Sequence, residues 1–223
     1  MPVTPKYVNE HFFDEDSKAM WYVFGVSFSQ YSSSLEQRTS SRSRWQSTDK
    51  KLIEIVKSSL DSENTITPKR YKHIRTGEDF FTYWLVLNNQ KIYDDIRRRG
   101  LDVPKSERTF PESIEEQYLD HFVRGFFDAH VSCYNSTYQS TSKYNPRELN
   151  RQWLEIHFNV PFLRGLYEVL VEHAHIKSGR EFSKSPLLIM DKDTRGVYDF
   201  LYRDWDFIQE NGLYLPSKKQ GLR

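Results

Sequence analysis

Two periodicities of apolar residues along this chain predict where its helices and strands lie. Apolar residues three and four positions apart are typical of an amphipathic helix, and alternation with a period of two is typical of a strand. Up to position 100, the pattern first predicts a helix over 19–29 and two strands within 31–44. A second helix follows, which Ser47 or Thr48 caps and which runs to Leu60. Strands over 65–75 and 80–87 come next, and then a helix around Ile92 and Ile96 that stops at Gly100.

The second half of the chain repeats this order of elements. Its pattern predicts a long helix over 114–130, strands over 131–138 and 152–158, a helix over 161–174, strands over 176–183 and 187–190, and a closing helix over 195–207. Both halves also end in a similar phrase, GLDVPKS at 100–106 and GLYLPSK at 212–218. A shared element order and a shared ending favour an internal duplication over a chance match. We therefore expect a polar lead over 1–18 and two repeats, 19–108 and 109–223.

The composition narrows the class of protein. The 223 residues can bury a sizeable core, and because 15% are aromatic against 37% hydrophobic overall, we expect that core to be rich in rings. A single cysteine, Cys133, excludes a disulfide framework and a cysteine-based zinc site. No apolar run approaches the roughly 20 residues of a membrane span, and no signal-peptide pattern opens the chain. The sequence thus predicts a soluble cytoplasmic protein without a membrane partner, associated with the nucleoid if the host is bacterial.

Charge is unevenly distributed along the chain. The formal net charge is only +1, which by itself gives no argument for a nucleic-acid partner. Between positions 38 and 75, however, ten Lys and Arg residues face four acidic residues. A basic sector in a near-neutral protein suits an oriented electrostatic footprint on nucleic acid. A solvated charged face is the alternative that charge alone leaves open.

Two short segments carry a resemblance to a known family. The segment VRGFFDAHV at 123–131 resembles the LAGLIDADG motif of homing endonucleases. A more degenerate copy, VFGVSFSQY, lies at 23–31. Three further phrases resemble bacterial and organellar members: TDKKLIEIVKSSL, NNQKIYDDIRRRGLDVPKSERTFP and GLYLPSKK. The resemblance covers roughly residues 12–220, and the order and spacing of the phrases are more specific than any one of them.

The resemblance implies an α+β fold built as a pseudo-symmetric monomer of two αββαββα halves. Each motif copy is a central helix, and the resemblance places Gly25 and Gly125 where these two helices touch. Each half contributes an antiparallel four-stranded sheet, and the two sheets form a saddle over the major groove of DNA. A mid-helix glycine costs on the order of 1 kcal/mol relative to alanine, which makes sense where another backbone must come close.

In this family an acidic residue at the foot of each motif helix holds a catalytic divalent metal. Gln30 and His130 stand at those two positions here. Mg²⁺ prefers hard, anionic oxygen ligands, and neither an amide nor an imidazole supplies that charge. Asp128 lies about 200° around the helix from His130 and is expected to be a helix-end or packing acid. The glycine that closes the motif is replaced by Tyr31 and Val131, so both turns must be remodelled.

The resemblance also places polar side chains on the DNA-facing surface of the sheets. Alternate residues of a strand share a face, so counting from the helix feet selects the candidates, although the later hairpins leave their parity open. The candidate DNA-binding residues are Ser32, Ser34, Glu36, Arg38, Arg42, Arg44, Gln46, Arg70, Lys72, Arg75, Ser132, Tyr134, Ser136, Tyr138, Trp153, Glu155, His157, Lys177, Arg180 and Lys184. Lys105 and Lys218 are candidates for phosphate contacts or plain surface lysines.

Three functions remain open from the sequence. The first is a sequence-specific protein that binds double-stranded DNA as a monomer, has lost its catalytic carboxylates, binds no cofactor and regulates transcription. The second is an active homing endonuclease whose Mg²⁺ ligands have moved to other residues. The third is an RNA-binding, maturase-like splicing factor, since some members of the family assist splicing. Metal-dependent cleavage separates the second function, and a preference for duplex DNA over structured RNA separates the first from the third.

Overall fold

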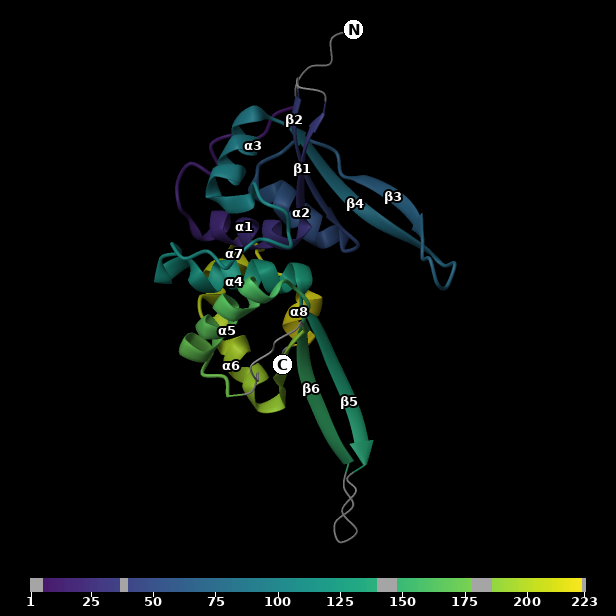
Figure 1. The fold of residues 1–223 in the computed structure, drawn as a ribbon, viewed down its shortest axis with the longest axis vertical. Helices are drawn as coiled ribbons and strands as arrows, with labels where there is room; N and C mark the ends of the chain where they lie inside the picture. The colour runs from purple at the N-terminus through teal and green to yellow at the C-terminus, as the bar shows by residue number, and fades with distance from the viewer. Residues whose placement is uncertain (1–5, 37–39, 140–147, 178–185, 222–223) are drawn as a thin grey trace.

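A computed structural model describes residues 6–36, 40–139, 148–177 and 186–221. Two helices, α1 (Lys18–Gln30) and α4 (Glu116–His130), lie side by side at the centre of the molecule, where the two halves of the chain meet (Figure 1). They are the two helices that the motif copies predicted. Within the described residues, no helix is both long and apolar enough to cross a membrane.

The central helices touch through their main chains at two glycines. A Cβ atom built on Gly25 would lie 2.1 Å from the carbonyl oxygen of Phe122, and one built on Gly125 would lie 2.0 Å from that of Tyr22. Neither separation is possible for a real side chain. The two glycines thus permit an approach that any other residue would prevent.

The first half follows the predicted order of elements. It contains, in sequence, α1, β1 (Tyr31–Glu36), β2 (Ser40–Ser47), α2 (Lys50–Ser59), β3 (Thr67–Lys72), β4 (Asp79–Asn88), α3 (Gln90–Ile96) and the short π-helical turn η1 (Arg97–Leu101). The strands form one antiparallel sheet in the order β1-β2-β4-β3. The predicted helix cap was wrong by one or two residues. Asp49 caps α2, because its carboxylate accepts a hydrogen bond from the main-chain nitrogen of Lys51.

The second half repeats the pattern with departures. It contains α4, β5 (Ser132–Gln139), β6 (Glu148–Ile156), α5 (Val160–Ala174), β7 (Leu187–Met190), α6 (Asp191–Leu201), α7 (Trp205–Glu210) and α8 (Pro216–Gly221). Its described strands form a three-stranded antiparallel sheet, β5-β6-β7, where four strands were expected. Of the strand predicted over 176–183, Ile176 and Lys177 are not extended into a ladder, and the remainder lies outside the described residues.

The predicted closing helix over 195–207 was wrong. It is two helices, and α6 ends at Leu201 while α7 begins at Trp205. The carbonyl of Leu201 accepts a hydrogen bond from the guanidinium of Arg124 at 3.1 Å. Arg203, in the break, donates to the carboxylate of Asp120 at 2.9 Å. Side chains of α4 therefore bind the groups that the break exposes.

The core lies between the inner faces of the sheets and the central helices, and it is rich in rings as the composition predicted. Phe126 and Phe162 have ring centroids 4.5 Å apart, and Phe28 and Phe122 are 5.1 Å apart, so rings from α1, α4 and α5 interlock. Under the first sheet, the indole nitrogen of Trp45 donates to the hydroxyl oxygen of Ser27 at 2.8 Å. A fully buried polar group thus has its partner on the central helix.

The two halves also have similar backbone conformation and burial at their ends. Gly100 and Gly212 both have a positive φ, 104° and 62°, which explains a glycine at each position. The leucine that follows each glycine is buried, with 2% of Leu101 and 1% of Leu213 exposed. The matching phrases at 100–106 and 212–218 therefore have matching backbone and burial, which supports the duplication.

Candidate nucleic-acid interface

The outer face of the first sheet carries the predicted polar residues of β1 and β2. Ser41, Ser43 and Trp45 are buried. The alternate residues of β2, Arg42, Arg44 and Gln46, therefore lie on the opposite face. The strand register sets Ser32 opposite Arg44, Ser34 opposite Arg42, and Glu36 opposite Ser40. Arg38 lies outside the described residues.

Arg44 is held in a defined orientation on this face. Its Nε donates to the hydroxyl of Ser32 at 2.9 Å, and its guanidinium carbon lies 4.5 Å from the centroid of the Trp84 ring. The Lys69 amine lies 5.6 Å from the same ring. A guanidinium that stacks on an indole keeps its planar fork, the feature that suits bidentate recognition. Trp84 and Lys69 were missing from the predicted site, although alternation along 80–87 could have indicated Trp84.

The structure fixes the parity of the β3–β4 hairpin. Lys69 pairs with Thr82 and shares the face of Arg44, whereas Arg70 and Lys72 pair with Phe81 and Asp79 on the opposite face. Arg70 forms an ion pair with Asp79 there.

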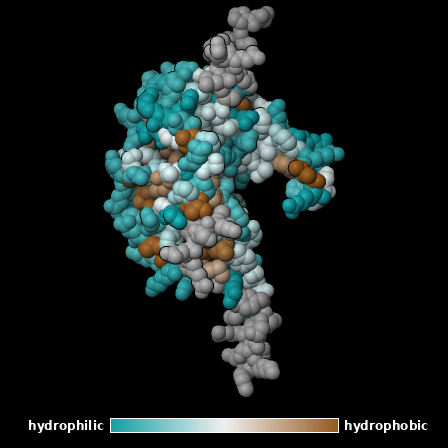
Figure 2. Space-filling view, viewed as in Figure 1, coloured by the Kyte–Doolittle hydropathy of each residue, from teal (hydrophilic) through white to brown (hydrophobic). Residues whose placement is uncertain are grey.

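The β3–β4 hairpin projects from the body as an arm, with exposed apolar residues on it (Figures 1 and 2). Arg75 lies in the turn at its tip. Arg70 and Lys72 therefore do not join the surface of Arg44, in contrast to the predicted grouping.

The outer face of the second sheet carries Ser132, Tyr134 and Ser136 of β5, opposite Glu155, Trp153 and Arg151 of β6. Leu154, Ile156 and Ile189 are buried on the inner face. Tyr138 pairs with Leu149 in the register. Arg151 of this face was missed because the strand was predicted to begin only at 152, and Leu188 and Met190 of β7, which share the face, were missed as well.

The remaining candidates of the second half are scattered. His157 follows β6, and its ring nitrogen lies 2.7 Å from the carboxylate of Glu155. The main-chain nitrogen of Lys177 donates to Asp193 at 3.0 Å, which places Lys177 beside the start of α6. Arg180 and Lys184 lie outside the described residues.

The feet of the two central helices hold no carboxylate. The Gln30 amide donates across to the main-chain oxygen of Ala129 on α4 at 2.8 Å. His130 contacts the main-chain oxygen of His157 through Nε2. Because a carbonyl only accepts, this nitrogen carries the hydrogen. Burial lowers the pKa of His130 below its usual value, so burial favours the neutral ring.

Basic side chains surround these feet. The amine of Lys105 donates to the carbonyl of Ser29, and the amine of Lys218 donates to that of Val131. Arg108 donates to the carbonyl of Phe28 at 2.5 Å. Cations at the carboxyl ends of the helices satisfy carbonyls that have no helical partner and complement the helix dipole. Each half thus places a lysine near the end of its central helix, and Arg108 was not singled out from the sequence.

Asp128 faces away from the feet, as the helical angle predicted. Its carboxylate accepts hydrogen bonds from the Tyr22 hydroxyl at 2.7 Å and from the main-chain nitrogen of Leu215 at 3.0 Å. Burial raises its pKa to about 7. The neighbouring Arg124 is fully buried and donates to the carbonyls of Leu201 and Leu213. This network ties the chain after α6 to the central helices.

The residues at the feet do not fit a catalytic Mg²⁺ ion. Gln30 and His130 are engaged with main-chain oxygens, and the nearby charges are the cations Lys105 and Lys218. A divalent cation needs anionic oxygen ligands, and these groups would instead repel it. Among the described residues, no cluster of three or more His, Cys, Asp or Glu side chains could hold a metal. Tyr31 and Val131, which replace the motif glycines, are extended with φ of −89° and −84°, so neither turn requires glycine.

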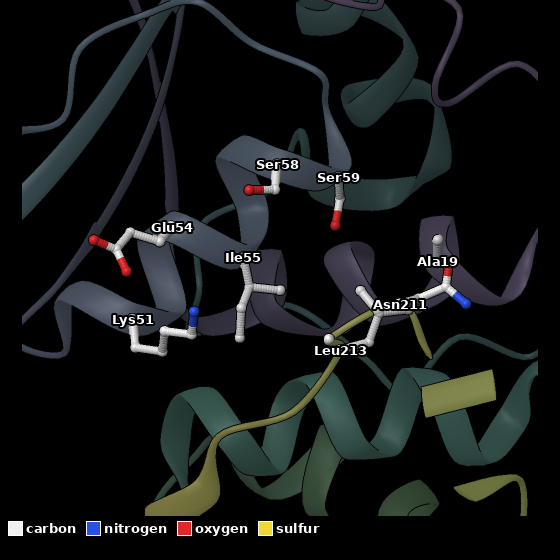
Figure 3. Close-up of a pocket in the computed structure, with 9 residues that line it drawn as sticks. Ala19, Lys51, Glu54, Ile55, Ser58, Ser59, Asn211 and Leu213 are labelled. Carbon is white, nitrogen blue, oxygen red and sulfur yellow. The ribbon is translucent and has the colours of Figure 1, made fainter. Parts of the chain in front are cut away.

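A recess between the halves is a second concave feature. Lys51, Glu54 and Ile55 of α2 line one side of it, and Asn211 and Leu213 line the other (Figure 3). The lining comes from both halves, so the recess marks their joint. Its mixture of one cation, one carboxylate and small polar groups is typical of such a solvated joint and does not indicate a particular reaction.

The fold of this chain is that of the LAGLIDADG homing endonucleases. One similar solved structure is the homing endonuclease I-WcaI bound to its DNA recognition sequence, with a TM-score of 0.59 and 14% identity over 93% of this chain and 87% of that chain. Another is the I-LtrWI LAGLIDADG homing endonuclease bound to target DNA, with a TM-score of 0.50 and 15% identity over 96% of this chain and 94% of that chain. No protein-family model and no curated protein matches the sequence. The predicted pseudo-symmetric α+β fold is confirmed.

Proposed function

We propose that this protein binds double-stranded DNA at a specific sequence, across the outer faces of both sheets, and does not cleave it. The observation that carries the proposal is the contrast between the residues of the sheet face and those of the helix feet. The sheet face retains an oriented arginine, Arg44, whereas the helix feet hold an amide and an imidazole among lysines.

Several features support duplex DNA as the ligand. An arginine fork that presents its edge can read guanine in the major groove, and serine and glutamine side chains supply further donors and acceptors. The strands of both sheets lie on one side of α3, α5 and α6, so their outer faces can meet one duplex (Figure 1). The two similar endonucleases were both bound to DNA.

The helix feet support binding without cleavage. Hydrolysis of a phosphodiester needs a metal or another group that stabilises charge on the attacking and leaving oxygens. At the feet, Lys105 and Lys218 add positive charge, but neither Gln30 nor His130 adds the anionic ligand that a divalent metal needs. A protein of this kind would act by occupying its site, for example to regulate transcription, and as a monomer it would cover both half-sites with one chain.

The first experiment is selection of bound sites from a random duplex library, followed by incubation of the selected site with Mg²⁺ or Mn²⁺. We expect one enriched duplex that stays intact. A site that is cut would overturn the claim of lost cleavage and favour displaced metal ligands. Failure to enrich any duplex, together with retention of structured RNA, would favour the maturase-like function.

A variant pair tests the sheet face itself. Arg44→Ala should weaken binding of the selected site by about 10- to 100-fold, the usual cost of losing one base-contacting arginine. Arg195→Ala removes the same charge from the exposed surface of α6, where Arg195 pairs with Asp199, and should change binding little. Equal affinity of Arg44→Ala and the parent protein would refute the assignment of the face.

A further inference from the structure

The two outer sheet faces differ in chemistry. On the first sheet, Arg42, Arg44 and Gln46 lie in a row along the central strand β2. On the second sheet, Trp153 of β6 is flanked by Tyr134 of β5 and by Leu188 and Met190 of β7, and these four residues form an apolar face. We use the name apolar face for these four residues. The difference matters because both faces would meet the same duplex under the proposed function.

The apolar face is continuous and partly exposed. The rings of Tyr134 and Trp153 stack with centroids 5.3 Å apart and planes 19° apart. Met190 lies opposite Trp153 in the register, and Leu188 lies opposite Glu155. Tyr134 and Leu188 each remain 42% exposed, and Trp153, Leu188 and Met190 line a shallow recess with Arg151.

An apolar face of this kind indicates a surface that binds a partner. The outer side of an antiparallel sheet is normally polar, because it faces water. A contiguous group of exposed apolar side chains usually marks a surface that binds something. The apolar face is bordered by Arg151, Ser136 and Glu155, which can donate and accept hydrogen bonds around it.

We propose that the apolar face binds the C5-methyl groups of thymines in the major groove, so that the half-site under the second sheet is rich in A·T pairs. This inference rests on the proposed function. Among the four bases, thymine alone presents an apolar group in the major groove, and apolar side chains recognise it there. The first sheet, with Arg44 stacked on Trp84, suits guanine instead. The protein would therefore read an asymmetric site.

Continuity with the rest of the interface favours DNA over another occupant. β5 begins at the foot of α4, directly beside Lys218, whose amine donates to the carbonyl of Val131 there. A duplex that reaches Lys218 from the first sheet would continue along β5 and β6. Single-stranded nucleic acid, whose bases could stack on Trp153, is a separate possibility that the experiment excludes or reveals.

The test replaces thymine by uracil in the selected duplex, which removes only the methyl group and leaves base pairing intact. The half-site under the first sheet is identified as the one whose base preference Arg44→Ala relaxes. Uracil in the other half-site should weaken binding by about fourfold for each contacted methyl, as expected for one buried carbon. Uracil in the Arg44 half-site should have no comparable effect.

A second variant assigns the effect to the apolar face. Leu188→Ser should discriminate between thymine- and uracil-containing sites less than the parent does, whereas Arg44→Ala should weaken binding of both and discriminate between them as the parent does. Because Leu188 is 42% exposed, the serine variant should melt close to the parent temperature.

The possible failures are distinguishable. If no duplex is enriched, the proposed function fails and the inference falls with it. If a duplex is bound specifically but uracil has no effect in either half-site, only the inference is overturned. Tighter binding of the single strand than of the duplex would also overturn it.

Discussion

Adding one methyl group at either central glycine should drive the two halves apart. In Gly125→Ala, the new Cβ would start 2.0 Å from the carbonyl oxygen of Tyr22 and 3.1 Å from the nitrogen of Val26. In Gly25→Ala, the corresponding atoms are the oxygen of Phe122 at 2.1 Å and the nitrogen of Phe126 at 2.9 Å. Every one of these neighbours belongs to a helix backbone, so no side chain can rotate away to make room.

The magnitude follows from the distance that the helices must move. Real Cβ contacts lie beyond 3.0 Å, so α1 and α4 must separate by roughly 1 Å. A gap of that size removes a quarter to a half of the dispersion energy of each contact along the interface. Overpacking of this kind costs about 1–3 kcal/mol or more, and alanine returns only about 1 kcal/mol of helix propensity. The hydrogen bond from Tyr22 to Asp128 would stretch as well. At the upper end of that range, after the gain in helix propensity, we expect a net loss of about 2 kcal/mol.

Urea unfolding followed by tryptophan fluorescence measures this loss, and the midpoint should fall by about 1 M for a protein of this size. Gly165→Ala is the matched control. It also exchanges a helical glycine for alanine, but its Cβ would lie 2.5 Å from the Cβ of Phe110 in a loop, so a loop and not a central helix would have to move. The reasoning is refuted if Gly25→Ala and Gly125→Ala lose no more stability than Gly165→Ala. The larger variants Gly25→Leu and Gly125→Leu should fail to fold.

Further predictions concern the buried polar groups. Burial raises the pKa of Asp128 to about 7, so the folded state holds a proton that the unfolded state releases near pH 4, and stability should fall as pH rises from 4 to 7. Asp128→Asn should remove this slope, and an unchanged slope in urea midpoints would contradict the assignment. Ser27→Ala leaves the indole nitrogen of Trp45 without its acceptor and should cost about 1–3 kcal/mol, as thermal melts of the variant and the parent protein would measure. Arg124→Met leaves the carbonyls of Leu201 and Leu213 unbonded and should lower the thermal midpoint by several degrees, most visibly by loss of protection of 202–215 in hydrogen exchange.

The sequence predicted much of the fold because its strongest patterns are local. Helical spacing located α1 and α4, and the face of each strand next to a motif followed by counting from Gln30 or His130. Arg44 and Trp153, on the neighbouring strands, were assigned to a face by alternation along their own strands. The prediction depended on there being no bulge between the helix foot and the strand, a condition that β1, β2, β5 and β6 meet.

The sequence did not predict features that depend on distant partners. The parity of Lys69 and Arg70 depends on the register set by a turn over 73–78, and nothing in the residues of β3 distinguishes the two faces. No glycine or proline lies at the break after Leu201, so the local sequence does not indicate it. The break instead depends on the side chain of Arg124 on another helix. An arginine within a motif helix would ordinarily be assigned to the surface, and only the fold shows that its guanidinium is buried.

Because the two halves belong to a single chain, they can differ, and this difference affects the orientation of the molecule on a duplex. A dimer of identical subunits has a twofold axis, so it meets a palindromic site identically either way round. Here the two sheets have diverged, with Arg44 on one and Leu188 on the other, and the molecule has two unlike ends. A duplex lying across both would be held in one orientation only. A single bound molecule would then point along the DNA and mark one strand as distinct from its complement.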